Sequence, residues 1–514
     1  MYTSPTVQNE IITIIGTTLQ ETIVNRALKA NYFTVLADET SDVQRIEQFS
    51  LCIRYVDPEV TELREDFLSF VPVYDVSGAG LANTIKKNLV SLGLDMNRLR
   101  GQGYDGASAM KGEFRGVQAI IAEEYPKALY THCASHCLNL CLNDSSKIPC
   151  IRNSFGIMSE VCNFFRASPH RIHVLKTKLN SSPLNHTGLI KYCETRWVER
   201  HEAVSLFVNA LLHVIEALEH ITDENKEGSA KAQILHKCVC DFSFIISLKV
   251  SEKMLSLTYS LSQCLQSKSI DLATALSQVE LVGLKLADMR SNSDEEFENI
   301  FKDSLELADV LGVVPAIPRC VGRQKHRENY SANSPKEYFR RMSFIPYIEE
   351  MSSSLSERFL SHKNIIVGLQ CIIPVNVVKS SFSDVETAFN FYADDLTNTN
   401  KVMFKGEWDL WKMKWKNSKD ELPKDAITAL KKCEEMLFPN LHILLEILAS
   451  LPVTTASVER SFSTLKRLKT YLRNSTGEDR LNGLALISIH RSIPLNEDIL
   501  IEKFAKKNRR MLLV

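Results

Sequence analysis

The sequence lacks the features of a secreted or membrane protein. Its first residues, MYTSPTVQNE, contain no positively charged segment followed by an apolar one, so there is no secretory signal. No apolar run reaches the roughly 18 residues that a membrane-spanning helix needs. The 13 cysteines are odd in number and lie far apart between Cys52 and Cys433, unlike those of a small disulfide-stabilised domain. We therefore expect reduced thiols, a nuclear location with the cytoplasm as the alternative, and no membrane partner.

A strong charge of either sign is also missing. The 61 Lys and Arg residues oppose 62 Asp and Glu residues, for a net charge of −1. The chain as a whole is therefore not drawn to nucleic acid, and any DNA contact must come from local basic patches. With 44% hydrophobic residues the composition is that of a core-forming protein. At roughly 100–200 residues per domain, 514 residues predict several units, or one fold split by a large insertion.

The first third of the chain alternates between strand and helix patterns after a helical lead-in over 1–30. Short apolar runs rich in β-branched and aromatic residues predict strands at 32–37, 49–56, 67–73, 99–103 and 128–133. The first three are so close together that they indicate an antiparallel meander. Helical patterns at 78–93 and 115–125 complete the order β-β-β-α-β-α-β over 31–149.

The pattern changes near residue 150. Helical periodicity with polar loops and little strand signal predicts an all-helical segment over 150–435. Residues 436–514 are again compact and apolar, with a buried helix at 440–449 and a second at 456–473. Ser475 followed by Glu478 is a capping-box pattern for a third helix, which Pro494 ends.

Two aspartates follow predicted strands closely. Asp38 stands at the end of the first strand in LADETSD, and Asp105 follows the fourth in GQGYDGASAM. The glycines beside Asp105 allow a tight turn and the close approach of a ligand. Two such carboxylates suit a hard cation such as Mg²⁺, which prefers oxygen ligands. Taken alone, each residue is better explained as a turn or cap residue, and the metal-binding interpretation remains the alternative.

Taken together, the segments resemble one family, the hAT DNA transposases, in the branch related to MYM-type zinc-finger host proteins. The similar segments, in chain order, are QNEIITIIG, YFTVLADETSD, EQFSLCIRYVD, GQGYDGASAMKGEFRGVQ, HCASHCLNL, TRWVERHEA, RQKHREN, EYFRRMSFIPYIEEM and VTTASVERSFSTLKRLKTYLRNS. The resemblance covers nearly the whole chain. It implies an α/β fold, with an RNase H-like core that is interrupted by a large all-α insertion over 150–435 and completed by C-terminal helices over 436–514.

The resemblance also implies a catalytic and metal-binding triad. Asp38 and Asp105 would be joined by Glu459, which stands in SVERSF at the start of a helix. Such a site would bind Mg²⁺ or Mn²⁺ and perform two-metal DNA strand cleavage and transfer of the DDE type. Without the resemblance, Glu459 is a helix-start glutamate favoured by the helix dipole.

A Cys-x-x-His element lies between the two halves of the predicted site. Cys133 and His136, with Cys137 and Cys141 nearby, have a spacing similar to that of zinc ligands, but no second ligand pair stands close by. The family carries this element as part of its core near the active site. We therefore expect Cys133 and His136 to pack beside the site and expect no zinc.

Several basic and aromatic residues are candidates for DNA contact. The resemblance places Arg196 and Trp197 where a Trp stacks beside an unpaired base, although a Trp that anchors the helical insertion is an equal alternative. A basic patch between 319 and 341 includes Arg323, Lys325, Arg327, Arg340 and Arg341. The tail 506–510, KKNRR, is either a nuclear-import or phosphate-contact segment or the solvated end of a helix.

The C-terminal region resembles the hAT dimerisation region, so we expect self-association. The expected dimerisation residues are Leu441, Leu444, Leu445, Leu448 and Phe462. The zinc finger of full-length relatives is not seen before the first helix, which puts sequence-specific DNA recognition in doubt and suggests a fragment, a truncated gene or a domesticated copy. Two functions remain open: a transposase-type nuclease, and a non-catalytic dimerising chromatin or transcription cofactor that binds other nuclear proteins.

Overall fold

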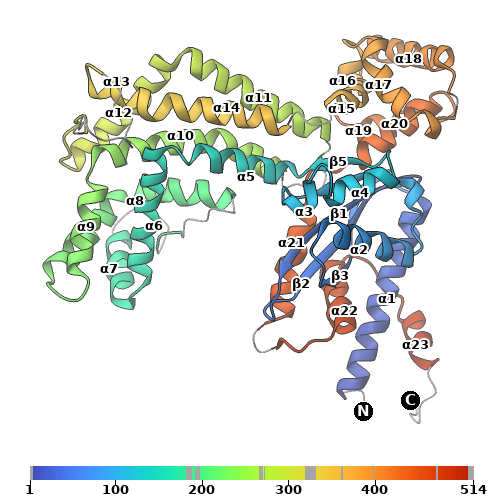
Figure 1. The fold of residues 1–514 in the computed structure, drawn as a ribbon, viewed down its shortest axis with the longest axis horizontal. Helices are drawn as coiled ribbons and strands as arrows, with labels where there is room; N and C mark the ends of the chain where they lie inside the picture. The colour runs from blue at the N-terminus through green and yellow to red at the C-terminus, as the bar shows by residue number, and fades with distance from the viewer. Residues whose placement is uncertain are drawn as a thin grey trace. The chain divides into compact units, whose positions relative to one another are not determined.

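The computed structural model describes residues 4–180, 188–190, 197–265, 270, 272–318, 332–359, 363–397, 399–470 and 473–506. The chain forms two compact units (Figure 1). Unit 1 comprises 1–136, 265–276 and 361–514, and unit 2 comprises 137–264 and 277–360. The segment 361–435, expected from its helical pattern to be part of the insertion, thus clusters with the unit that contains the sheet.

Unit 1 contains a five-stranded mixed sheet with the order β3-β2-β1-β4-β5. The strands are β1 (Phe33–Ser41), β2 (Glu47–Asp57), β3 (Glu62–Val73), β4 (Leu99–Tyr104) and β5 (Leu129–His132). The first three are antiparallel neighbours, whereas β4 runs parallel to β1 and β5 parallel to β4. The predicted succession of strands along the chain and the antiparallel meander of the first three are therefore confirmed.

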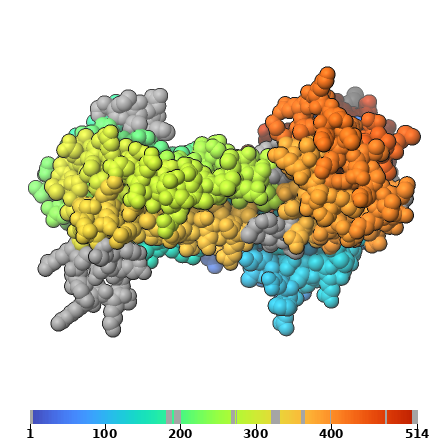
Figure 2. Space-filling model, turned by 90° about the horizontal axis from the view of Figure 1, so that it is seen from above, coloured from blue at the N-terminus to red at the C-terminus, as the bar shows by residue number. Residues whose placement is uncertain are grey.

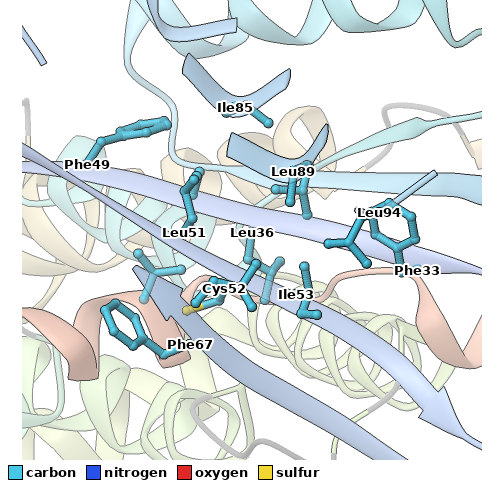
Figure 3. Packing of buried hydrophobic residues seen from close by; sticks show 14 of the residues in the cluster. Phe33, Leu36, Phe49, Leu51, Cys52, Ile53, Phe67, Ile85, Leu89 and Leu94 are labelled. Carbon is cyan, nitrogen blue, oxygen red and sulfur yellow. The ribbon is translucent and has the colours of Figure 1, made fainter. Parts of the chain in front are cut away.

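Both faces of this sheet are covered, so the central strands β2 and β4 are buried along almost their whole length, polar residues included. On one face, Leu51 and Ile53 of β2 pack with Ile85 and Leu89 of α2 (Gly78–Ser91) (Figure 3). Cys52 points to the opposite face, because successive strand residues alternate. That second face is covered by α21 (Ala456–Leu468), whose Ser461 hydroxyl lies 2.7 Å from the hydroxyl of Ser50. The second face therefore carries the side chains of even-numbered residues of β1 and β2.

Further helices complete the sheet layer. They are α1 (Pro5–Lys29), α3 (Ser108–Lys111), α4 (Val117–Glu124), α20 (Pro439–Ser450), α22 (Glu478–Ile489) and α23 (Glu497–Ala505), whereas α5 (Ala134–Ser145) begins in unit 1 and lies mostly in unit 2. The first helix packs against α22 so closely that a Cβ added to Gly16 would lie 2.6 Å from the Cα of Gly483. One core thus contains Leu19 near the N-terminus and Leu481 near the C-terminus.

The rest of unit 1 is a group of helices beside α20. They are α15 (Lys363–Gln370), α16 (Pro374–Val377), α17 (Phe382–Phe391), α18 (Lys401–Lys416) and α19 (Ala426–Lys431), with a short turn, η3 (Ala393–Asp395). Asp395 in that turn forms a buried ion pair of 2.6 Å with Arg100 of β4. This ion pair connects the helical group to the sheet within unit 1.

Every described element wholly within unit 2 is helical. These elements are α6 (Pro149–Arg166), α7 (Pro169–Asn180), α8 (Trp197–Asp223), α9 (Ser229–Val239), α12 (Ser293–Val310), α13 (Pro335–Phe339), the π-helix η2 (Arg340–Phe344) and α14 (Ile345–Phe359), and most of α10 (Phe242–Leu265) and α11 (Leu272–Ser291) also lies there. Within α8, Arg200–Asp223 is long and apolar enough to cross a membrane, which the sequence did not lead us to expect. Because 61% of its most apolar window is buried inside the chain, we interpret it as a core helix.

Candidate functional site

The first candidate residue, Asp38, stands where the buried part of β1 ends. Residues 33–37 are fully buried, and Asp38 is the first half-buried position of the strand. It pairs with Ser50 of β2, so its side chain lies on the sheet face that α21 covers. Its Oδ1 accepts a hydrogen bond of 2.9 Å from the backbone N–H of Glu39.

The second candidate, Asp105, reaches the same edge of the sheet by strand geometry. Leu36 of β1 is the parallel partner of Gly103 of β4, and each aspartate comes two residues later on its own chain segment. Parallel neighbours end at the same edge, and a two-residue step returns to the same face. The Oδ1 atom of Asp105 accepts a hydrogen bond of 3.0 Å from the N–H of Ala107, and the tyrosine hydroxyl of Tyr130 donates to the Asp105 carbonyl at 3.3 Å.

The third candidate, Glu459, is brought to this edge by the segment before α21. Pro452 lies against β4, because a Cβ added to Gly103 would be only 2.8 Å from the Cβ of Pro452. The carbonyl of Val453 accepts from the N–H of Ala134 at 2.8 Å, at the end of β5. Glu459 then stands exposed in the first turn of α21. The glycines of GQG thus make room for the segment that carries the third carboxylate.

Asp105 and Glu459 are both close enough to Asp38 to affect it electrostatically. Burial, together with the negative charges of Asp105, Glu39 and Glu459, raises the pKa of Asp38 to about 8. Burial, with Asp105 and Glu47, likewise raises the pKa of Glu39 to about 7. Asp105 and Glu459 therefore both lie within electrostatic range of Asp38, although hundreds of residues separate the last from the other two, and a shared metal site remains a prediction.

The arrangement brings like charges near one another at one edge of the sheet. Across the described ranges of the chain, no three His, Cys, Asp or Glu side chains lie close enough to hold one metal ion together. Like-charged carboxylates repel one another, and this repulsion adds to the effect of burial in raising the pKa of Asp38. The donor chemistry fits Mg²⁺ or Mn²⁺, which prefer carboxylate oxygens. Such an ion would require the three side chains to move closer together.

The Cys-x-x-His element borders the site as expected. Cys133 is fully buried, its sulfur accepts a hydrogen bond of 3.2 Å from the Thr455 N–H, and burial together with the charge of Glu459 raises its pKa to about 11. His136 is only half-buried. A Cβ added to Gly106 would lie 2.7 Å from Nε2 of His132 and 3.2 Å from Cδ2 of His136. The glycine after Asp105 therefore admits both histidines to the rim of the site.

Sequence reasoning missed three residues around the site. Glu39 follows Asp38 directly, and an acidic pair at a strand end was the available signal. His132 is the last residue of β5 and stands directly before the Cys-x-x-His element, whose spacing does not include it. Glu65 lies in the middle of β3 in the alternating segment ELREDF, where a charged residue is usually solvent-exposed.

Glu65 belongs to a buried network that fixes the start of α21. Its Oε1 accepts from Arg54 at 2.6 Å, and both side chains are almost completely buried. Its other carboxylate oxygen accepts a hydrogen bond from the hydroxyl of Ser457, two residues before Glu459. Arg54 also donates to the carbonyls of Ile270 and Ala449. The network therefore ties the helix of the third carboxylate to β2 and β3.

We expect Gly103→Ala to destabilise the protein by about 1–3 kcal/mol, because the new methyl group would overpack a filled space. It would lie 2.7 Å from Cδ2 of Leu36 and 2.8 Å from Cβ of Pro452. Gly156→Ala is the control, since a Cβ there meets open space on α6 and should stabilise the helix by about 0.5–1 kcal/mol. Thermal melting followed by circular dichroism measures both. A Gly103→Ala variant as stable as Gly156→Ala would show that Pro452 does not rest on β4.

Of the residues predicted to contact DNA, the structure describes the side chains of Arg340 and Arg341. Arg340 forms an ion pair with Asp294, and Arg341 forms one of 2.7 Å with Glu337. Both arginines are therefore already paired within unit 2. The remaining predicted residues lie outside the described residues, namely Arg196, Arg323, Lys325, Arg327 and the side chain of Trp197.

The predicted dimerisation residues lie inside the chain's own core. The side chains of Leu441, Leu444, Leu445 and Leu448 are completely buried, and Phe462 is packed against the core of the sheet. The expectation that the apolar helix at 440–449 is buried on several faces is confirmed. Because its leucines pack against β2 and the neighbouring helices, they are not available to a partner, and assigning them to a dimer contact was wrong.

Two regions of the chain match known families. Residues 1–116 match the ZMYM1/FAM200 RNase-like domain, and residues 403–493 match the hAT family C-terminal dimerisation region. The first match contains Asp38 and Asp105, and the second contains Glu459. The second match also supports self-association.

Two mammalian proteins are similar along almost the entire chain. Proteins of Homo sapiens and Mus musculus, both named 52 kDa repressor of the inhibitor of the protein kinase, are 28% and 27% identical to it. Each alignment of 522 positions covers 98% of this chain and 68% of the relative. Together with the two family matches, these relatives confirm the resemblance to hAT-derived proteins that the sequence motifs predicted.

Proposed function

We propose that this chain is a transposase-derived, self-associating protein with an RNase H-like core whose acidic site binds divalent cations and cleaves DNA strands. The observation that supports the proposal is that Asp105 and Glu459, from distant segments of the chain, both lie close enough to Asp38 for their charges to raise its pKa. Chain segments far apart in sequence supply them, so local turn formation does not explain why they meet. The matched RNase-like and hAT regions support the same assignment.

The residues of the site would have distinct tasks in such a reaction. Bound Mg²⁺ or Mn²⁺ would supply an activated water or 3′-hydroxyl and would stabilise the leaving oxygen. Asp38 and Asp105 would hold the cations from fixed strand ends. Glu459 would close the site from α21, a helix held in place by Ser457 and Glu65. Cys133 and His136 would support this arrangement from the rim without binding zinc.

A second function is favoured by the relatives. The two similar mammalian proteins are named as repressors, and their names describe no nuclease activity. A domesticated copy of this fold would act in the nucleus as a non-catalytic chromatin or transcription cofactor, self-associating and binding other nuclear proteins. In that case the carboxylates would be a remnant of the ancestral site.

Cleavage of DNA decides between the two functions. The purified chain should nick supercoiled plasmid DNA in Mg²⁺ or Mn²⁺ and not in EDTA. Asp105→Asn and Glu459→Gln should each reduce the rate at least about 100-fold, since each removes a cation ligand worth several kcal/mol in the transition state. Glu478→Gln, at the exposed first turn of α22, is the matched control and should leave the rate unchanged. A folded, self-associated chain that fails to nick DNA in either metal would support the cofactor function instead.

A further inference from the structure

Helix α18 has one face that packs inside unit 1. Phe404, Trp408, Trp411 and Trp415 are buried on that face. The ring of Phe404 stacks on Phe389 with a centroid distance of 4.5 Å, and the Trp411 indole N–H donates to the Ile372 carbonyl at 2.8 Å. These contacts hold the helix rigidly against its neighbours. The helix therefore presents its other faces at fixed positions.

The face away from the aromatic residues is also apolar, but it is exposed. Val402, Met403, Leu410 and Met413 have 77%, 60%, 56% and 57% of their surface exposed. At about 100° per residue these four side chains fall within an arc of roughly 100°, with Gly406 in the middle. A Cβ added to Gly406 would meet nothing within 4 Å. These five residues, here called the α18 stripe, form a smooth apolar surface with a shallow centre.

Two further exposed apolar residues, Met436 and Leu437, lie in the turn before α20, and Lys414 of α18 contacts that turn. Lys414 lies beside the stripe on α18 and donates to the carbonyl of Lys432 at 3.0 Å. Its ammonium group also lies 5.3 Å from the ring centre of Phe438. This contact holds the turn that carries Met436 and Leu437, which are 101% and 51% exposed. In Figure 2 the orange segments that include α18 lie on the side toward the viewer.

The sequence match indicates which partner should cover this surface. The hAT C-terminal dimerisation region begins at residue 403, within α18. The leucines of α20, the most apolar segment of that region, are used entirely in the chain's own core. Among the residues described between 403 and 493, the exposed large hydrophobic ones are Met403, Leu410, Met413, Met436 and Leu437. All of them lie in the α18 stripe or in the turn beside it.

We propose that the α18 stripe is the surface through which two copies of this chain associate, with the two α18 helices packed antiparallel around a two-fold axis. The axis would lie at the level of residue 407. Val402 and Met403 of one copy would then lie over Met413 and Leu410 of the other. The absence of a side chain at Gly406 would allow the two helices to approach closely.

The charges beside the stripe fit the same arrangement. Lys405 and Asp409 are both exposed, lie next to the stripe and are placed symmetrically about residue 407. In an antiparallel pair, Lys405 of one copy faces Asp409 of the other, and the contact occurs twice because the interface is isologous. A partner of different sequence would not require this self-complementarity. The inference rests on the self-association included in the proposed function and is independent of the acidic site.

The test uses the full chain without DNA or metal. Sedimentation equilibrium should show a dimer of the unchanged protein. Leu410→Glu combined with Met413→Glu should raise the dissociation constant at least about 100-fold, because it places charges in the centre of an apolar interface. The matched control is Leu281→Glu with Leu284→Glu on α11, where two leucines are 60% and 70% exposed outside the dimerisation region.

Charge exchange distinguishes this geometry from a general apolar contact. Lys405→Asp and Asp409→Lys should each weaken the dimer, and the double variant should restore it, because the facing pair is then reversed. A dimer that the two glutamates leave intact, or a chain that stays monomeric up to about 100 μM, would overturn the inference. Loss of DNA nicking with an intact dimer would count against the acidic site alone, so the two proposals fail separately.

Discussion

The variant Asp38→Asn should melt at a clearly higher temperature than the unchanged protein at pH 8 and at nearly the same temperature at pH 4. The pKa of Asp38 is raised from an ordinary value of 3.8 to about 8 by burial and by the neighbouring carboxylates. Between these two values the folded chain retains a proton that the unfolded chain releases, so stability falls as the pH rises through this window. At about 1.4 kcal/mol per pKa unit, the full effect at pH 8 is on the order of 5 kcal/mol.

The matched control is Asp420→Asn, which changes an exposed loop aspartate of the same unit. Its melting temperature should follow that of the unchanged protein at every pH. Addition of Mg²⁺ at pH 8 should stabilise the unchanged protein and have little effect on Asp38→Asn, because only the former retains the full set of carboxylates. Equal melting temperatures for Asp38→Asn and the unchanged protein across pH 4 to 8 would mean that Asp38 is not held in a cluster of like charges.

Replacement of Glu65 by alanine should lower the free energy of unfolding by about 3–5 kcal/mol, as breaking a buried ion pair does when one charge is left behind. The side chains of Arg54 and Glu65 are only 1% and 3% exposed, so solvent cannot replace the lost carboxylate. Arg54 would retain hydrogen bonds only to the carbonyls of Ile270 and Ala449. Denaturant titration with fluorescence detection measures the loss.

Glu59→Ala provides the comparison, because the ion pair of Glu59 with Lys29 is exposed and should be worth less than about 1 kcal/mol. A double-mutant cycle with Ser457→Ala then measures how strongly Glu65 is coupled to the helix that bears Glu459. A loss for Glu65→Ala no greater than that for Glu59→Ala would contradict the buried network. So would a coupling energy close to zero.

The sheet could be predicted from sequence because its signals are local. Apolar runs bounded by turn residues mark β2, β4 and β5 within about two residues, whereas β1 extends about four residues beyond its apolar run and β3 begins about five residues before its own. The meander follows from the short connections. Helix ends were less certain. The helix predicted at 456–473 ends at Leu468, and α22 begins after Gly477 with no side-chain cap, not from the capping box predicted at Ser475.

The candidate site could be predicted only in part. Strand geometry alone brings Asp38 and Asp105 together. Each lies two residues after one member of a paired position, Leu36 on β1 and Gly103 on the parallel strand β4. No periodicity indicates that Glu459 joins them, since that depends on Pro452 resting on β4, and here the family resemblance supplied the prediction. Glu65 was missed because a buried ion pair in a strand has the same sequence pattern as an exposed one.

The leucines of α20 show a different limit. A helix that is apolar on all sides must be buried, but its sequence does not say whether its own chain or a second copy buries it. The exposed residues of α18 were overlooked for the converse reason. Their helix also carries three buried tryptophans, and these alone would explain an apolar pattern in its sequence. The pattern therefore does not indicate a second, exposed apolar face.

The packing of α1 against α22, with Gly16 in contact with Gly483, has a consequence for biosynthesis. The first five strands leave the ribosome well before the helices that cover one face of their sheet. At about 5–20 residues per second, the roughly 300 residues between β5 and α21 take on the order of 15–60 s to synthesise. During that interval the apolar face around Cys52 has no covering helix, and the edges of the sheet are open to other nascent chains. The sheet of unit 1 can therefore be completed only after translation, and its folding yield in a cell should depend on chaperones that bind the N-terminal segment.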